Sequence, residues 1–184
     1  MTRQYKLRNS KTLIVRQGRP ADAEGFIDYA NQVAGESDFL TFNAGEFDES
    51  VEFQRMIIEE LNDKTYGLFL IAEMDGEVAG NLTFRLGMRT KVSHAGEFGL
   101  TVKKQYWNLG IGRILIQTLI DWAHDSGNVR KINLKVREDN WRGIALYKKL
   151  GFSQEGILKR EFYSKGVFFD ALAMGLCIDL EKND

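Results

Sequence analysis

The sequence predicts a single domain of the α/β (α+β) class, with a mixed, mostly antiparallel sheet and helices on both of its faces. Two observations lead to this prediction. Three apolar segments follow one another between residues 68 and 102, and the hairpin signal Asp75-Gly76 joins the first two, which is typical of an antiparallel meander. From residue 95 onward, strand, glycine turn, helix and strand make a βαβ unit, whose two strands should be parallel with a right-handed crossover.

The N-terminal part supplies one strand and two helices before the meander. Residues 12–16 are rich in β-branched side chains and favour a strand. Pro20 and Asp22 then open a helix. The polar, acidic and aromatic stretch 35–49 predicts a long loop or broken helix, and loops of that length are often functional. A second helix is expected over residues 48–61.

The remaining elements follow from periodicity and from glycine stops. We expect the domain to run from residue 11 to residue 180, with short polar ends. Within it, we expect strands over residues 68–73, 78–86, 95–102 and 131–137, helices over 113–125, ended by Gly127, and from Asn140 to Leu150, ended by Gly151, and a final strand pair over 156–163 and 168–178, joined at Lys165-Gly166.

Composition excludes several classes of protein. The 184 residues carry a formal net charge of −1, which argues against a whole-domain electrostatic nucleic-acid binder. The N-terminus lacks the apolar core of a signal peptide, and the longest apolar run, residues 68–72, is too short to cross a bilayer. The single cysteine, Cys177, permits no intrachain disulfide, so we expect a reducing, cytoplasmic location and a buried Cys177 that acts as a small hydrophobic residue.

The segment Gln105–Arg113, which contains Gly110-Ile-Gly112, lies between a predicted strand and the start of a helix. Unpaired amides and the helix dipole make such a position suitable for a phosphate group. The dinucleotide fingerprint would need a third glycine where Leu115 stands, and a phosphate-binding Walker loop would need Lys where Arg113 stands. Both common nucleotide motifs are therefore absent.

Two segments carry a family resemblance. Gly110-Ile-Gly112-Arg113-Ile-Leu115 resembles the acetyl-CoA pyrophosphate loop of the GCN5-related N-acetyltransferases (GNAT), and residues 140–152 resemble the second signature of that superfamily. The order of predicted elements fits over nearly the whole chain. One departure is Trp107, where many members have Gln or Arg. The chain is most similar to the bacterial amino-acid, small-amine and ribosomal-protein N-acetyltransferases.

This resemblance implies a binding mode for acetyl-CoA. Backbone groups of Leu100 and Val102 would pair with the pantetheine arm like an extra strand. The pyrophosphate would lie against Val102 and the helix start, and the pantetheine and thioester would lie beside the next helix. The implied contacts to the phosphates are Gly110, Ile111, Gly112 and Arg113, those along the arm are Asn140, Ala145 and Tyr147, and Lys148 or Lys149 would reach the 3′-phosphate. No metal is expected.

The chemistry needs a base and an acid. An amine with a pKa near 10 must lose a proton before it attacks, and a carboxylate at the cleft can accept that proton. Glu97 is the leading candidate, because it lies in an otherwise apolar strand where partial burial is expected, and His94 is the rival. Tyr147 matches the position at which the family protonates the departing thiolate.

The sequence leaves the acceptor open. The acids of residues 36–49 would favour a cationic amine, Arg85 and Arg89 would favour a carboxylate, and the interleaved aromatic rings would wall an apolar pocket; the residues of that loop are Glu36, Asp38, Glu46, Asp48 and Glu49 with Phe39, Phe42 and Phe47. The leading function is transfer of an acetyl group from acetyl-CoA to a small amine or amino acid. The alternatives are a protein N-terminal or lysine acetyltransferase and a non-catalytic acyl-CoA sensor. No nucleic-acid or membrane partner is expected, and a homodimer stays open.

Overall fold

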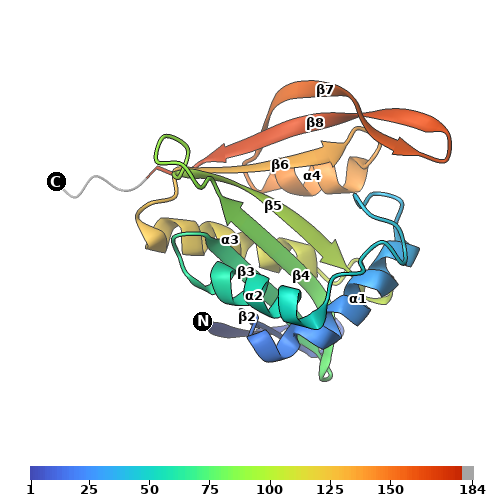
Figure 1. Cartoon of the computed structure of the whole chain (residues 1–184), viewed down its shortest axis with the longest axis vertical. Helices are drawn as coiled ribbons and strands as arrows, with labels where there is room; N and C mark the ends of the chain where they lie inside the picture. The colour runs from blue at the N-terminus through green and yellow to red at the C-terminus, as the bar shows by residue number, and fades with distance from the viewer. Residues whose placement is uncertain (180–184) are drawn as a thin grey trace.

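The structure, a computed structural model, describes residues 1–179 and has one eight-stranded sheet in the order β1-β2-β3-β4-β5-β6-β8-β7 (Figure 1). Within the described residues, β5 and β6 form the single parallel pair, as the βαβ pattern predicts. The mixed sheet is therefore confirmed. The strands are β1 (Thr2–Lys6), β2 (Thr12–Gln17), β3 (Gly67–Met74), β4 (Glu77–Leu86), β5 (Ala95–Val102), β6 (Lys131–Arg137), β7 (Ser153–Ser164) and β8 (Val167–Cys177).

Strand β1 corrects the expectation of a short polar N-terminal end. Residues 2–6 pair antiparallel with β2 and place the sheet edge before residue 11. The strand contains one apolar residue, Tyr5, and its exposure alternates without a buried position, so it has no hydrophobic pattern to detect. It is held by the backbone pairing with β2, by the packing of Tyr5 against the core and by an ion pair between Arg3 and Asp121. The expected C-terminal limit of the domain, residue 180, lies outside the described residues.

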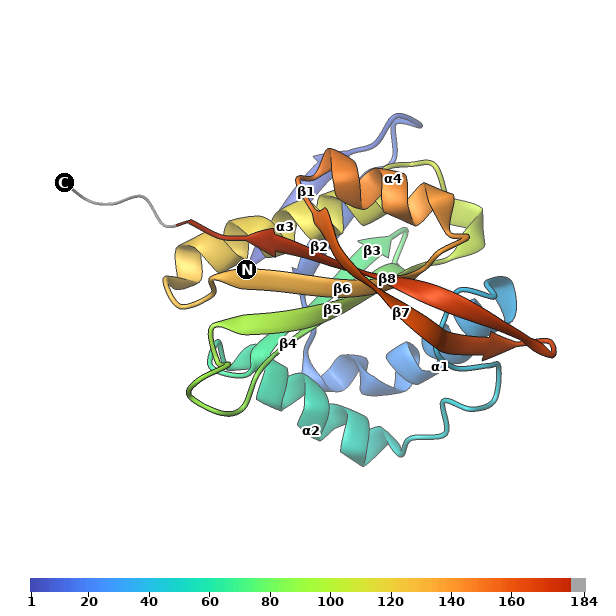
Figure 2. The same cartoon turned by 90° about the horizontal axis from the view of Figure 1, so that it is seen from above.

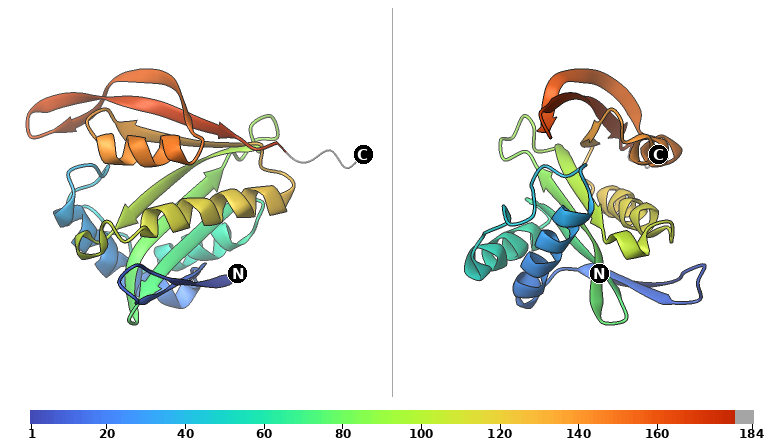
Figure 3. Two further views of the ribbon diagram at one scale, coloured as in Figure 1. Left: turned by 180° about the vertical axis from the view of Figure 1, so that it is seen from behind. Right: turned by 90° about the vertical axis from the view of Figure 1, so that its right-hand side faces the viewer.

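The four main helices lie on both faces of the sheet, as expected (Figure 2). One face carries α1 (Ala23–Glu36), preceded by a 3₁₀ turn at Pro20–Asp22, and α2 (Val51–Asn62). The other carries α3 (Ile111–Ser126) and α4 (Trp141–Lys149), seen from behind in Figure 3. The Ser50 hydroxyl accepts a hydrogen bond from the Phe53 amide at the start of α2, and Gly127 ends α3 with φ +71°.

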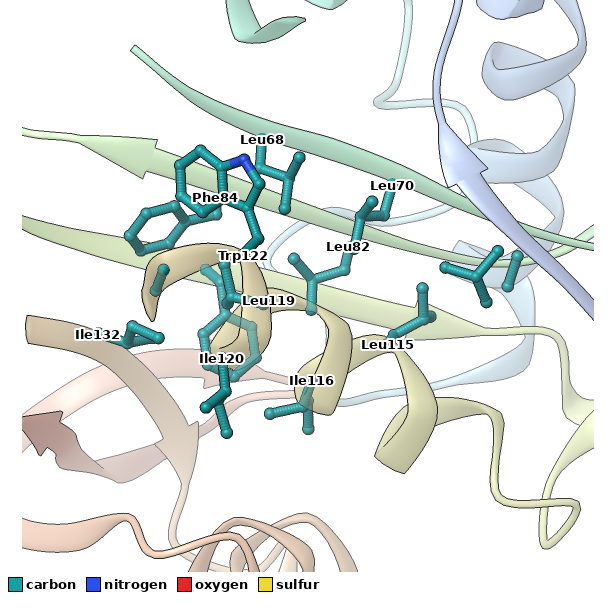
Figure 4. Close-up of a cluster of buried hydrophobic side chains, with 14 of the residues drawn as sticks. Leu68, Leu70, Leu82, Phe84, Leu115, Ile116, Leu119, Ile120, Trp122 and Ile132 are labelled. Atoms are coloured by element: carbon teal, nitrogen blue, oxygen red, sulfur yellow. The ribbon is translucent and has the colours of Figure 1, made fainter. Parts of the chain in front are cut away.

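The core is divided between the two faces because successive strand residues point to opposite sides. On the α3 side, Leu82 and Phe84 pack with Leu115, Leu119 and Trp122 (Figure 4). On the α1–α2 side, the core includes Phe69, Ile71, Phe26 and Ile58. On α2, Ile58 is fully buried, whereas Met56 is 60% exposed.

Strands β5 and β6 separate after a short stretch of pairing. Only Ala95–Glu97 pairs with Lys131–Asn133, although both strands continue beyond those residues. The two strands then diverge (Figure 1). Residues 98–102 consequently keep an unpaired backbone edge in the middle of the sheet. We call the point after Glu97 where β5 and β6 separate the β5–β6 fork, and it positions the functional site.

The prediction that Cys177 is buried is wrong. Cys177 is exposed, at the last residue of β8. Pairing of β8 with β7 already ends at Gly175, so the last residues of β8 lack a strand on that side. Its neighbour Ile178 is buried instead.

Candidate active site

A cleft of about 1030 Å³ passes through the fork between β5 and β6. One end lies at the start of α3, where Gly110 and Gly112 line it, and the other lies on the α1 face, where Arg85 and Glu97 line it. The wall on the α1 face includes residues 37–43 and Phe47, which follow α1. The cleft therefore connects the predicted phosphate site with the predicted acceptor side.

The start of α3 has the geometry of an anion site. Gly110 is the N-cap residue with φ +86°, a left-handed conformation that favours glycine. The amides of Ile111, Gly112 and Arg113 belong to the first turn, so they have no intrahelical acceptor, and all three residues line the cleft. A Cβ on Gly112 would lie 3.4 Å from Leu100 and 3.5 Å from Leu146, which shows how closely β5 and α4 approach this turn.

Two side chains outside the glycine pair shape the same loop. The Trp107 indole N–H donates to the Val102 carbonyl at 2.7 Å, so Trp107 holds the loop against the end of β5. Arg142 donates to the Asn108 side chain at 2.8 Å and lines the cleft, as Arg113 does. Two guanidinium groups thus lie beside the helix start. Sequence reasoning missed Arg142, whose only signal is its place two residues after the N-cap Asn140.

The backbone of β5 presents hydrogen-bonding groups to the cleft. The Lys103 amide donates to the Ala79 carbonyl on β4, so alternation directs the backbone groups of Leu100 and Val102 away from β4. Beyond Glu97 these groups face no strand, because pairing with β6 has ended. The Trp107 indole donates a hydrogen bond to the Val102 carbonyl. The other backbone amide and carbonyl groups of Leu100 and Val102 are positioned to pair with an extended ligand. These residues fit the pantetheine arm of acetyl-CoA.

Tyr147 lines the cleft from α4 on the α3 face. Its ring packs edge-to-face on Phe98, with centroids 5.9 Å apart, and on Phe152 at 6.1 Å. Burial raises the pKa of the Tyr147 hydroxyl to about 12. The hydroxyl therefore keeps its proton at neutral pH and can act as a donor.

Glu97 is the last residue of β5 that pairs with β6, so it lies where the fork opens. Its side chain points to the α1 face, because the adjacent Phe98 packs against α4 and Thr101 bonds Tyr29 of α1. Glu97 is exposed and lines the cleft, so the expected partial burial is wrong. Lys135 on β6 donates to Glu161 at 2.8 Å, and this bond, with a smaller contribution from Glu97, raises the pKa of the Lys135 ammonium.

A row of polar residues that sequence reasoning missed continues from Glu97 along the same face. Asn81 is buried, donates to the Leu70 carbonyl at 2.8 Å and accepts from the Thr83 hydroxyl at 3.1 Å. The Tyr29 hydroxyl lies 2.8 Å from that of Thr101, and burial raises its pKa. Asn81 interrupts an apolar strand, which is the one signal that the sequence offers for this row.

The acids of the 36–49 stretch mostly lie outside the cleft. The Glu36 carboxylate accepts from the Lys104 amide at 2.6 Å, and Glu46 accepts from the Asn43 backbone and side chain, bonds that lower the pKa of Glu46. Asp38 lines the cleft and pairs with Lys165 at 2.7 Å, which lowers the pKa of the Asp38 carboxyl. The acids Glu36, Glu46, Asp48 and Glu49 do not line the cleft, whereas Phe39, Phe42 and Phe47 do.

Several residues singled out in the sequence lie elsewhere. His94 and Arg89 are exposed in and beside the connection before β5 and do not line the cleft. Lys148, Lys149 and Ala145 are exposed on α4 and do not line it either. Asn140 lines the cleft, and its side chain accepts from the Gly143 amide at 3.0 Å, which confirms it as the cap of α4.

Within residues 1–179, no group of three His, Cys, Asp or Glu side chains is arranged to hold a metal ion. In the same part of the chain, none of the helices has the length and apolarity needed to cross a membrane.

Comparison with known proteins agrees with this architecture. Residues 34–152 match the model of the acetyltransferase (GNAT) family. The chain is 34% identical over 116 residues to the L-amino acid N-acetyltransferase AaaT of Escherichia coli, covering 63% of this chain and 72% of that protein. It is 27% identical over 157 residues to spermidine N(1)-acetyltransferase of the same species, covering 85% and 82%.

Solved structures agree as well. A GNAT-family acetyltransferase from Streptococcus pneumoniae superposes with a TM-score of 0.87 at 30% identity, over 91% of this chain and 99% of that one. The protein yncA of Salmonella typhimurium, solved with its cofactor acetyl-CoA, shares the fold with a TM-score of 0.79 at 21% identity, over 94% and 96%. The chain belongs to the GNAT family and is an N-acetyltransferase.

Proposed function

We propose that this protein transfers the acetyl group of acetyl-CoA to the primary amine of a small molecule or amino acid. The observation that carries the proposal is the continuous cleft through the β5–β6 fork, with free helix amides at one end and Glu97 and Arg85 at the other. A donor on the α3 side and an amine on the α1 side would meet at the fork. Relatives that act on amino acids and on spermidine support a small amine acceptor.

The donor side is assigned to residues that fit acetyl-CoA. When bound, acetyl-CoA supplies an acetyl thioester that an amine can attack. The amides of Ile111, Gly112 and Arg113 would hold the pyrophosphate, and the free backbone edge at Leu100 and Val102 would hold the pantetheine arm. Asn140 and Tyr147 would lie along that arm. Arg142 adds a second cation beside Arg113.

Glu97 is proposed as the base. A free amine attacks only after it loses a proton, and Glu97 is the carboxylate of β5 at the mouth of the fork. Tyr147 is proposed as the acid, because its hydroxyl stays protonated at neutral pH and lies on the opposite side of the fork. It would give its proton to the departing sulfur. A backbone amide of β5 would stabilise the negative charge on the acyl oxygen.

The acceptor end favours a small molecule over a polypeptide. The turn between β7 and β8 lies close to the segment after α1, as the distance between the exposed side chains of Lys165 and Asp38 shows, although this exposed pair is not needed to hold the two together. Tyr163 and Ser164 from the end of β7 line the cleft together with residues 37–43. The hairpin and this segment therefore bridge the acceptor side and narrow the approach. Arg85 lines the cleft and forms a long, half-exposed ion pair with Glu60 at 3.8 Å, which an acceptor carboxylate would replace.

A thiol-release assay with acetyl-CoA and a panel of acceptors tests the proposal. The panel contains the amino acids, polyamines, and peptides with free N-termini or lysines. We expect turnover with at least one small amine and weaker turnover with peptides. Turnover confined to peptides would assign protein acetylation, and cofactor binding without turnover of any amine would assign a sensor.

A further inference from the structure

The acceptor side of the cleft has a wall that does not belong to the sheet. Residues 37–43 and Phe47 line it, yet the stretch between α1 and α2 contains no helix or strand. Phe42 and Phe47 pack together at 5.4 Å, and Phe47 packs on Phe26 of α1 at 5.7 Å, so the far part of the stretch is anchored in the core. Phe39 is 37% exposed and does not pack in that core cluster, so other contacts must hold it in place.

Arg137, the last residue of β6, provides these contacts. Its guanidinium donates to the Asp38 carbonyl at 2.9 Å and lies over the Phe39 ring, 4.6 Å from the centroid. A second ring, Phe169 of β8, lies on it at 4.1 Å. Asp139 accepts from Nε at 2.6 Å and from Nη2 at 2.9 Å, which fixes the plane of the guanidinium.

This arrangement uses a cation that is buried in the protein. Arg137 is 7% exposed, and the Asp139 carboxylate neutralises its charge. Arg137 lines the cleft, but all three guanidinium nitrogens donate to protein oxygens and two aromatic rings lie against the group, so its hydrogen-bond donors are engaged by the protein. The desolvation cost of a buried ion pair is offset only where the geometry is good and the donors are satisfied, and the hydrogen bonds of Arg137 to Asp139 and to the Asp38 carbonyl meet both conditions.

We propose that Arg137 is a positioning residue for the acceptor: it holds Asp38 and Phe39 against the end of β6 and thereby sets the width of the acceptor pocket. The proposal deepens the proposed function, on which it rests for the nature of the acceptor. Asp38 also forms an ion pair with Lys165, but the two side chains are 59% and 76% exposed, and exposed ion pairs contribute little to stability. The position of Phe39 therefore depends on Arg137.

The substitution Arg137→Lys keeps the charge but loses the planar guanidinium, with its several hydrogen-bond donors and its stacking on the aromatic rings. We expect the acceptor KM to rise about tenfold with kcat changed less than about threefold, in line with the loss of a charged hydrogen bond. Stabilisation by acetyl-CoA should stay unchanged, because the donor contacts lie on β5, α3 and α4. The matched control Lys165→Met removes the exposed tie to Asp38 and should leave the acceptor KM within about twofold.

Limited digestion with chymotrypsin tests whether Arg137 holds Asp38 and Phe39 in place, and it does not depend on measuring catalytic activity. In Arg137→Lys, cleavage at Phe39, Leu40 or Phe42 should be about tenfold faster than in the wild type and in Lys165→Met, since cleavage follows the population of the open segment. Equal cleavage in all three proteins overturns the proposal. If the wild type acetylates no amine, the proposed function fails while this comparison still decides whether Arg137 holds the segment.

A double substitution separates positioning from direct binding. If Arg137 acts through Phe39, the acceptor KM of Arg137→Lys with Phe39→Leu should be no higher than that of the worse single variant. If the two effects multiply, Arg137 contacts the acceptor itself and the positioning role is wrong.

Discussion

Glu97 and Tyr147 face one cleft from opposite sides of the sheet. Glu97 projects from β5 toward α1, whereas Tyr147 lies on the α4 side, where its ring packs on Phe98, the residue next to Glu97. In a continuous sheet these two side chains would be separated by backbone. The loss of pairing after Glu97 opens a passage between them, so the base and the acid proposed for these two positions would reach the two ends of one reacting group.

Glu97→Gln should lower kcat at neutral pH by about 10² or more, because the amide cannot accept the proton of the amine. The variant keeps the size of the side chain, and stabilisation by acetyl-CoA should be unaffected. Raising the pH should partly restore the rate, since more of the amine then arrives unprotonated. The measurement is kcat/KM against pH with the best acceptor.

His94→Gln is the matched control for this experiment, because His94 is exposed and lies outside the cleft. Its pH profile should match that of the wild type. A profile that collapses in His94→Gln and stays unchanged in Glu97→Gln would reverse the two assignments.

Tyr147→Phe should lower kcat by about 10² while the KM for acetyl-CoA changes little, as expected for the loss of a proton donor. The ring keeps its packing on Phe98 and Phe152, so the fold should be intact. Steady-state kinetics with both substrates varied measures this. Wild-type turnover in the variant would show that Tyr147 serves packing alone.

Tyr147 should also make the free energy of unfolding fall as the pH rises in the alkaline range. Its pKa is raised to about 12 in the folded state against an ordinary 10.0, so its contribution is present below pH 10 and is lost as the pH rises through 12. Tyr29 acts in the same direction. The free energy of unfolding of Tyr147→Phe should therefore fall less between pH 10 and pH 12 than that of the wild type. Denaturant unfolding at several pH values tests this, and parallel curves would contradict it.

Gly112→Asp should abolish stabilisation by acetyl-CoA, because the carboxylate would lie among the helix amides proposed to hold the pyrophosphate. Gly112→Ala is the control, since its Cβ would make ordinary contacts of 3.4 and 3.5 Å. Thermal unfolding with and without acetyl-CoA measures both. An undiminished shift in a folded Gly112→Asp protein would remove this loop from the binding site.

The two glycine turns show what local sequence can determine. Asp75-Gly76 and Lys165-Gly166 both have positive φ at each residue, as hairpin turns require, and both hairpins are present. Asn140 caps α4 as expected, and Gly127 and Gly151 end helices with positive φ. These features depend on neighbours within a few residues, so the sequence by itself specifies them.

Gly110 and Gly112 were identifiable because they stand at the junction of a strand and a helix. Tyr147 was singled out only through the family resemblance. Arg137 and Asn81 were not singled out. Each has its partners far along the chain: Arg137 bonds Asp38 and lies on Phe169, and Asn81 bonds Leu70 on the neighbouring strand. Asn81 stands out locally as a polar residue in an apolar strand, but the sequence does not show which distant partners either residue contacts.

The sequence by itself determined the order of the strands and helices after residue 11 and the parallel βαβ unit, because periodicity, caps and turn glycines act over short distances. It also indicated the family, through the resemblance of residues 110–115 and 140–152 to known motifs. The tertiary structure alone decided where β5 leaves β6, that Glu97 is exposed at that point, and which of Arg85 and Arg89 reaches the cleft. The physical reason is that these properties follow from how distant segments pack: strand divergence depends on the sheet as a whole, and burial depends on what covers a residue.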